Sequence, residues 1–245
     1  VVEPLLGTRA EIAVETEDPA LTVAVEQDII TEIRRLERVF SVFDPNSALS
    51  AMRRSSETDV EELRTVAALA TRWHIRTAGA FHPALEPLLQ IWRQAEVADA
   101  LPTDDEISEA LSELQASSVH HLDLNALAKG WIAQQAVEGA VRSTGTHDRV
   151  TNLWLSLGGD IVHRGQSAIA VGIENPHRPY DNVAPLATVE ISNEALATSG
   201  SARRWWMIQG RKYSKVLDSR TGWPADHVAS ATVVAADAAT ADVLA

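Results

Sequence analysis

The chain has 245 residues and is acidic, with 21 Lys and Arg against 34 Asp and Glu, a formal net charge of −13. A field of this sign repels nucleic-acid phosphates and anionic lipid, so neither is an expected partner. The absence of cysteine excludes disulfides, thiolate zinc sites and a cysteine nucleophile. No apolar run is long enough to span a membrane, and the length suits a single domain over 1–245, possibly as two intimately packed lobes.

The start of the chain bears on its compartment. From Val1 onward the sequence shows no basic segment followed by an apolar one, and no lipid-bearing cysteine. This slightly favours a cytoplasmic location, and export is expected instead if a leader has been trimmed. Oligomeric state leaves no signal in the sequence.

The first half is predicted to be mostly helical. Strands are expected over 10–15 and 22–25. Apolar residues at four- and three-residue steps then predict a helix over 27–43 that buries Ile29, Ile33, Leu36 and Phe40. Further helices are expected from Thr58, on both sides of 101–103, and over 125–144 closed by Gly145. Thr58 with Glu61 and Thr103 with Glu106 fit the capping-box pattern.

The second half has the pattern of strands. These are expected over 150–157, 168–174, 186–192, 203–208, 212–217 and 229–235, with a tight turn at 209–211 and a last helix over 238–245. Helices followed by strands indicate the α+β class.

Two polar clusters contain Gly, Asp or Asn beside an expected element. In Asp123-Leu124-Asn125-Ala126-Leu127-Ala128-Lys129-Gly130 a Lys stands in the first turn of a helix, where the helix dipole repels it. This Lys either faces solvent beyond an N-cap or meets an anionic ligand. In Leu157-Gly158-Gly159-Asp160 the paired glycines suit either a hairpin turn or a close approach of backbone to ligand.

Two more clusters lie further along. Ala197-Thr198-Ser199-Gly200-Ser201, followed by Arg203 and Arg204, is either a phosphate cradle or a loop between strands. The segment from Tyr213 to Pro224 precedes Thr240-Ala241-Asp242. Asp218 and Arg220 either pair in a turn or serve a site, and Asp242 is either an exposed helix residue or a ligand. No P-loop, G-x-S-x-G or His/Glu zinc pattern occurs.

The order of these segments resembles the ApbE family, the FAD:protein FMN transferases once called thiamine-biosynthesis lipoproteins. The matching segments are Leu6-Gly7-Thr8, Phe43 to Ser50, Gly79-Ala80-Phe81-His82-Pro83, Pro87-Leu88 with Trp92, Leu122 to Gly130, Leu157 to Ile161, Thr198-Ser199-Gly200, Arg220-Thr221-Gly222 and Ala241-Asp242. Any one of them is a weak signal, whereas the ordered set covers nearly the whole chain and is specific.

The resemblance implies an α+β protein with a T-fold-like core, in which helices pack on a largely antiparallel sheet. It implies Mg²⁺-dependent cleavage of FAD, release of AMP and transfer of FMN to a Ser or Thr hydroxyl of a target protein. By resemblance, the cofactor contacts are Asn46, Ser47, Ala80, Phe81, Asp123, Lys129, Gly159, Thr198 and Lys215. The Ala126 carbonyl and Asp242 are the metal ligands, and Asp242, Lys129 and Lys215 are the catalytic residues.

Several positions depart from the family pattern. Lys215 stands in place of the family's histidine, Ser219 in place of a proline, His82 in place of an aspartate and Gln134 in place of another aspartate. Two alternatives therefore stay open beside an active transferase. One is an FAD-binding homologue with impaired catalysis, and the other is an FAD pyrophosphatase that releases FMN and AMP.

Overall fold

The computed structural model describes the chain except for residues 1, 56–57, 117–121, 123–124, 144–148 and 181. Its largest element is a six-stranded antiparallel sheet in the order β1-β2-β3-β4-β7-β10. The strands are β1 (Val2–Leu5), β2 (Thr8–Thr16), β3 (Val150–Leu157), β4 (Asp160–Gly165), β7 (Ala195–Gly200) and β10 (Ser230–Ala235). The class is α+β, as the sequence predicts.

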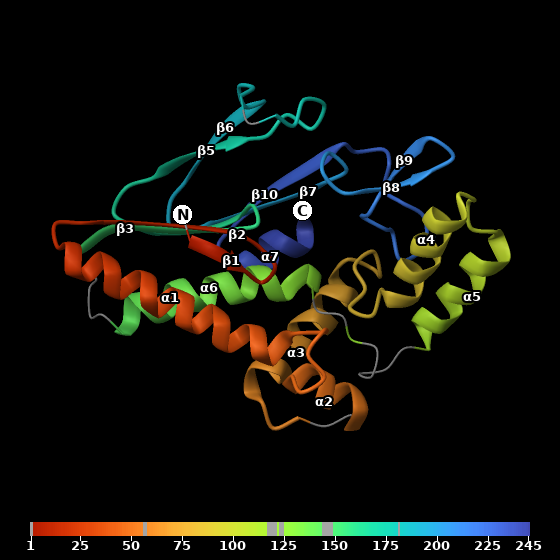
Figure 1. Ribbon diagram of the computed structural model, residues 1–245, viewed down its shortest axis with the longest axis horizontal. Coiled ribbons are helices and arrows are strands. Elements are labelled where there is room, and N and C mark those ends of the chain that lie inside the picture. The colour runs from red at the N-terminus through yellow and green to blue at the C-terminus, as the bar shows by residue number, and fades with distance from the viewer. Residues whose placement is uncertain (1, 56–57, 117–121, 123–124, 144–148, 181) are drawn as a thin grey trace.

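Helices α1 (Pro19–Phe40), α6 (Asn125–Ser143) and α7 (Ala238–Leu244) cover one face of this sheet (Figure 1). The predicted stripe of α1 is confirmed, because Ile29, Ile33 and Leu36 are fully buried and Phe40 is 6% exposed. These side chains join alternate residues of β3 and the apolar face of α6 in the main core.

Helix α1 begins earlier than predicted, and the strand expected over 22–25 is wrong. Asp18 caps the helix by accepting hydrogen bonds from the backbone N–H groups of Ala20 and Leu21, and Pro19 occupies the first turn. A capping aspartate and a proline with a preset φ outweigh the strand preference of Thr22 and its β-branched neighbours. The helix ends at Phe40, three residues before the predicted end.

A second core lies beside the sheet. It is formed by α4 (Glu86–Ala98), α5 (Asp104–Gln115) and the hairpin of β8 (Trp205–Ile208) and β9 (Arg211–Ser214), at the right of Figure 1. Trp92 of α4 stacks on Trp206 of β8 with ring centroids 5.5 Å apart. The capping box of Thr103 and Glu106 is confirmed. Gln209 and Gly210 both have positive φ, which confirms the tight turn.

Several described elements correct the sequence prediction. Helix α2 (Ala48–Ser55) was not expected. Helix α3 (Glu61–Arg76) has Val60 as its N-cap, so the capping box of Thr58 and Glu61 is wrong, and the Thr58 hydroxyl instead accepts from the Val60 N–H at 3.1 Å. Strands β1, β4 and β7 were not expected.

Strands β5 (Ile169–Ile173) and β6 (Ala187–Ile191) form a separate hairpin, close to their predicted positions. The hairpin stands above the main sheet in Figure 1. Within the described residues, no helix is both long and apolar enough to cross a membrane.

Candidate functional site

Lys129 lies in the second turn of α6, and its ammonium group forms an ion pair with the Asp160 carboxylate at the start of β4. Asp160 is 4% exposed. Burial raises the pKa of Asp160, against the opposing positive charges of Lys129 and Arg204. The helix dipole disfavours Lys129, and the carboxylate compensates for it. The reading of Lys129 as a solvated side chain is therefore wrong.

Asp242 of α7 reaches the same turn of α6, where its Oδ2 accepts a hydrogen bond of 3.1 Å from the Gly130 N–H. Burial, followed by the nearby Asp160 charge, raises the pKa of Asp242 to about 7, against the charge of Lys129. The reading of Asp242 as an exposed helix residue is therefore wrong. Lys129, Asp160 and Asp242 come together from three separate elements.

The donor groups around Asp242 suit a hard cation. In an α-helix the amide of Gly130 points toward the carbonyl of Ala126, four residues earlier, and Asp242 accepts from that same amide; the Ala126 carbonyl therefore stays a predicted ligand. The pKa values of the buried Asp160 and the half-buried Asp242 are raised despite the nearby positive charge of Lys129, and carboxylate and carbonyl oxygens are the ligands that Mg²⁺ prefers. Among the described residues no three His, Asp or Glu side chains converge as a complete metal site.

Two tight turns lie side by side at the end of the sheet where Asp160 begins β4. Leu6 and Gly7 connect β1 to β2 with positive φ, and Gly158 and Gly159 connect β3 to β4 in the same way. A Cβ on Gly158 would lie 2.6 Å from the Thr8 hydroxyl, so the close packing of the turns requires glycine there. The hairpin reading of Gly158-Gly159 is confirmed, and no described atom lies within 4 Å of the Cβ position of Gly159.

The loop with Ala80 and Phe81 is held from two sides. The Ser219 hydroxyl reaches the Gly79 carbonyl and lies 3.2 Å from the Ala80 carbonyl. From α3, His74 Nδ1 lies 2.9 Å from the Phe81 carbonyl, and since a carbonyl only accepts, this nitrogen carries the proton. Ser219, at the family's proline position, therefore connects this loop to the turn at 218–222.

That turn is itself fixed. Asp218 and Arg220 form a two-point ion pair, which confirms the pairing within a turn. The Trp92 indole N–H donates to the Gly222 carbonyl at 2.9 Å, which ties the turn to α4.

His82, at the family's aspartate position, is not a carboxylate substitute. Its ring meets His74 edge-on with centroids 4.6 Å apart, and its Nδ1 accepts from the Ala84 N–H at 3.1 Å. Burial, and then the charge of His74, lowers the pKa of His82 to about 4. The imidazole is therefore neutral near pH 7.

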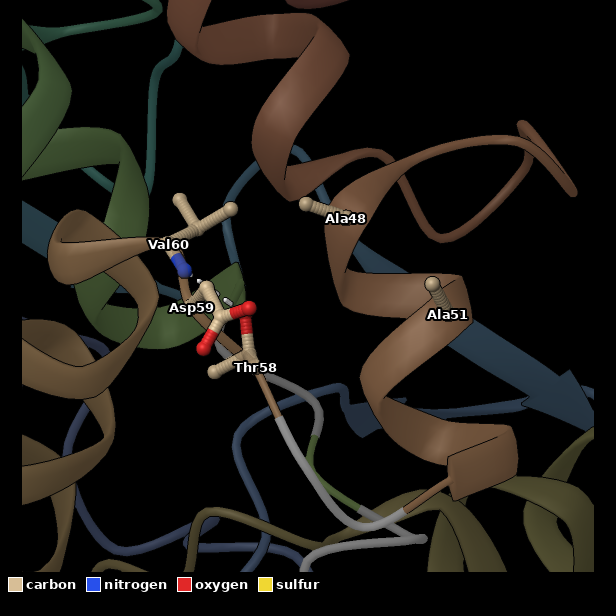
Figure 2. A pocket seen from close by; sticks show the side chains of 5 residues that line it. All are labelled: Ala48, Ala51, Thr58, Asp59 and Val60. Carbon is tan, nitrogen blue, oxygen red and sulfur yellow. Dashed lines mark hydrogen bonds between the residues drawn. The ribbon is translucent and has the colours of Figure 1, made fainter.

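Asn46 and Ser47 precede α2. Asn46 is exposed, whereas Ser47 is buried, and its hydroxyl donates to the Ser41 carbonyl at 2.6 Å and accepts from the Ser50 N–H at 3.0 Å. A cavity of about 260 Å³ lies beside this helix. Figure 2 shows Ala48 and Ala51 of α2 facing Thr58, Asp59 and Val60 across it. None of the predicted site residues lines this cavity.

The structure places Thr198 and Lys215 in other secondary-structure surroundings than the sequence predicts. Thr198 lies in strand β7, with its hydroxyl 2.9 Å from that of Thr232 on β10, so the loop reading is wrong for residues 197–200. The last residue of this strand has no room for a side chain, since a Cβ on Gly200 would lie 2.6 Å from the Ala229 carbonyl oxygen. Lys215 is exposed beyond β9, with its ammonium nitrogen 5.6 Å from the Trp206 ring centroid.

Asp123 and Asp160 differ in how they relate to the sequence prediction. Asp123 lies outside the described residues. Asp160 was quoted in the sequence only as part of a glycine turn, and nothing local predicts that it pairs with Lys129, 31 residues away. A buried charge at the first position of a strand is a signal only once the strand itself is known.

The sequence matches the ApbE family over residues 6–245. It is 28% identical to the FAD:protein FMN transferase of Treponema pallidum, over 99% of this chain and 76% of that protein. It is also 28% identical to the FAD:protein FMN transferase of Vibrio cholerae, over 91% of this chain and 73% of that protein. The ApbE protein from Thermotoga maritima has a similar structure, with a TM-score of 0.81, 24% identity, and coverage of 99% of this chain and 83% of that one.

Proposed function

The chain belongs to the ApbE family, and we propose that it is an FAD:protein FMN transferase. In this proposal it uses Mg²⁺ to move FMN from FAD to a Ser or Thr hydroxyl of a target protein and releases AMP. The observation that carries the proposal is the meeting of Lys129, Asp160 and Asp242 in a chain whose relatives bear that name.

The reaction is a phosphoryl transfer. The acceptor hydroxyl oxygen bonds to the phosphorus that carries the riboflavin portion, and the bond from this phosphorus to the bridging oxygen breaks. AMP leaves with that oxygen and its electron pair, and the hydroxyl proton passes to the AMP phosphate. Such transfers need positioning and compensation of negative charge more than covalent help from the protein.

The residues of this chain supply both needs. Asp242 and the Ala126 carbonyl would hold Mg²⁺, which supplies a positive charge that polarises the phosphate oxygens. Lys129 holds Asp160 in place and offers a cation toward the phosphates. Lys215 would add a point charge at the histidine position of the family, and Ala80, Phe81, Gly159 and the remaining predicted contacts would line the flavin cleft.

The test is incubation of the chain with FAD and Mg²⁺, with and without a Ser/Thr acceptor peptide, followed by separation of AMP and FMN and by peptide mass measurement. A transferase gives AMP together with a peptide that has gained FMN. Free FMN and AMP without peptide would identify the pyrophosphatase instead. Tight FAD binding without AMP release would identify a homologue with impaired catalysis. In that case Lys215, which stands in place of the family's histidine, is the first residue to test.

The Asp242→Asn variant is the control for metal dependence, because it keeps the shape of the side chain and removes its charge. It should lose the product at every Mg²⁺ concentration that supports the parent chain.

A further inference from the structure

Six Lys and Arg residues lie between positions 203 and 220, an unusual density for an acidic chain: Arg203, Arg204, Arg211, Lys212, Lys215 and Arg220. They surround the β8–β9 hairpin. Five of them have an ion-paired or aromatic partner in the described structure. Arg204 has neither.

The partners of the five are specific. Arg203 binds the Glu174 carboxylate, Arg211 lies 3.9 Å from a carboxylate oxygen of Asp226, and Arg220 pairs with Asp218. Lys212 lies over the Trp205 ring at 3.7 Å and Lys215 over the Trp206 ring at 5.6 Å.

Arg204 differs from its neighbours. It is exposed, and within the described residues its guanidinium has no hydrogen-bonded, ion-paired or aromatic partner. A guanidinium is a fork of donors that matches phosphate oxygens two at a time.

The strand register places Arg204 beside the candidate site. The last pair of the β8–β9 ladder is Trp205 with Ser214, and Arg204 and Lys215 are the residues that flank this pair just outside the two strands. On the other side, β7 runs antiparallel to β4 from the pair of Leu196 with Ile161 toward Asp160, and Arg204 follows four residues after the end of β7. Arg204 is accordingly close enough for its charge to stabilise the Asp160 carboxylate.

We propose that Arg204 contacts the pyrophosphate of FAD and, with Lys129 and Lys215, forms a cationic rim around the two carboxylates. This assignment rests on the proposed function. The charges support it: Lys129 and Arg204 balance Asp160 and Asp242, so bound Mg²⁺ adds two positive charges that the two negative charges of a pyrophosphate neutralise. Lys215 provides a point charge, whereas Arg204 provides two-point geometry as the bridging oxygen leaves with AMP.

The experiment measures flavin binding by fluorescence in the complete chain, with Arg204→Ala, Arg204→Lys and Arg203→Ala. Arg203→Ala is the matched control, since it removes the same charge at the adjacent position, where Glu174 already occupies the guanidinium. Each chain is titrated with FAD and with riboflavin, which has no phosphate, at low and high salt. Thermal unfolding confirms that each variant folds.

Arg204→Ala should weaken FAD binding at least about tenfold, as expected for loss of a charge-assisted hydrogen bond, and should leave riboflavin binding unchanged. Arg204→Lys should recover part of the loss, and Arg203→Ala should change the FAD dissociation constant less than about twofold. The salt dependence of FAD binding should be weaker in Arg204→Ala.

Two results would overturn the assignment alone: FAD binding by Arg204→Ala equal to that of Arg203→Ala, or an equal loss of riboflavin binding. A parent chain that binds no FAD would overturn the proposed function and this assignment with it.

Discussion

The contact between α6 and α7 leaves no room for a side chain at Gly130. A Cβ there would lie 2.5 Å from the Ala238 carbonyl oxygen, 2.9 Å from its carbon and 3.1 Å from the Asp242 Cβ. The obstructing carbonyl is backbone at the first residue of α7, so it moves only if α7 moves. We therefore expect Gly130→Ala to displace the helix that carries Asp242.

The change that Gly130→Ala makes in the free energy of unfolding has opposing contributions. Overpacking costs about 1–3 kcal/mol, and loss of the Gly130 N–H bond to a carboxylate about 1.5–3 kcal/mol. Alanine recovers about 1 kcal/mol of helix propensity. The net expectation is a destabilisation of about 3 kcal/mol, which at this chain length lowers the Tm by about 6–12 °C.

Gly139 in the same helix is the control, because its Cβ position has no atom within 4 Å. Gly139→Ala should stabilise the protein by about 0.5–1 kcal/mol through helix propensity alone. The assay is thermal unfolding followed by circular dichroism, with AMP release as a second measurement. If both alanines raise the Tm, the close approach of α7 to Gly130 is refuted.

Three further predictions concern the site. Burial raises the pKa of Asp242 from 3.8 to about 7, so the stability that its neutral form contributes is complete below pH 3.8 and is lost as the pH rises through 7. The metal-free chain should therefore lose stability over that range, and Asp242→Asn should flatten the Tm–pH curve; an unchanged curve would contradict the burial of this carboxyl. Lys215→Ala should weaken FAD binding by about 1–3 kcal/mol. Lys212→Ala, which removes a cation from the same hairpin, should leave FAD binding unchanged. Lys215→His should speed FMN transfer if the lysine alone slows it. Ser219→Ala should cost about 1–2 kcal/mol of stability and raise the KM for FAD, and recovery of both in Ser219→Thr but not in Ser219→Val would identify the hydrogen bond to Gly79 as the cause.

Periodicity made the buried stripe of α1 and the helix of Asn125 to Ser143 predictable from the sequence. The same local reasoning misplaced the residues around Thr22, because strand preference is weaker than an N-cap and a proline in the first turn. Strand β7 escaped prediction because its place in the sheet depends on pairing with β10, a neighbour 40 residues away at the pair of Ala195 with Ala235.

The residues of the candidate site also differ in whether the sequence could identify them. Lys129 and Asp242 could be identified because their segments resemble a family pattern, although their surroundings give no local signal. Asp160 could not, since its role depends on the register of β3 with β4 and on an ion pair across 31 residues. The separate partners of Arg203 and Arg204, adjacent in the sequence, were likewise indistinguishable before the fold was known.

Helix α7 closes the site from the far end of the chain, and Gln134 of α6 accepts its first amide at 2.7 Å through the Ala238 N–H. During synthesis, a chain that has reached β10 has Lys129 and Asp160 but still lacks the Asp242 carboxylate. A nascent polypeptide cannot assemble this group of charges until α7 has left the ribosome and docked against α6. Under the proposed function, a product that terminates before α7 would therefore leave the cellular FAD pool intact.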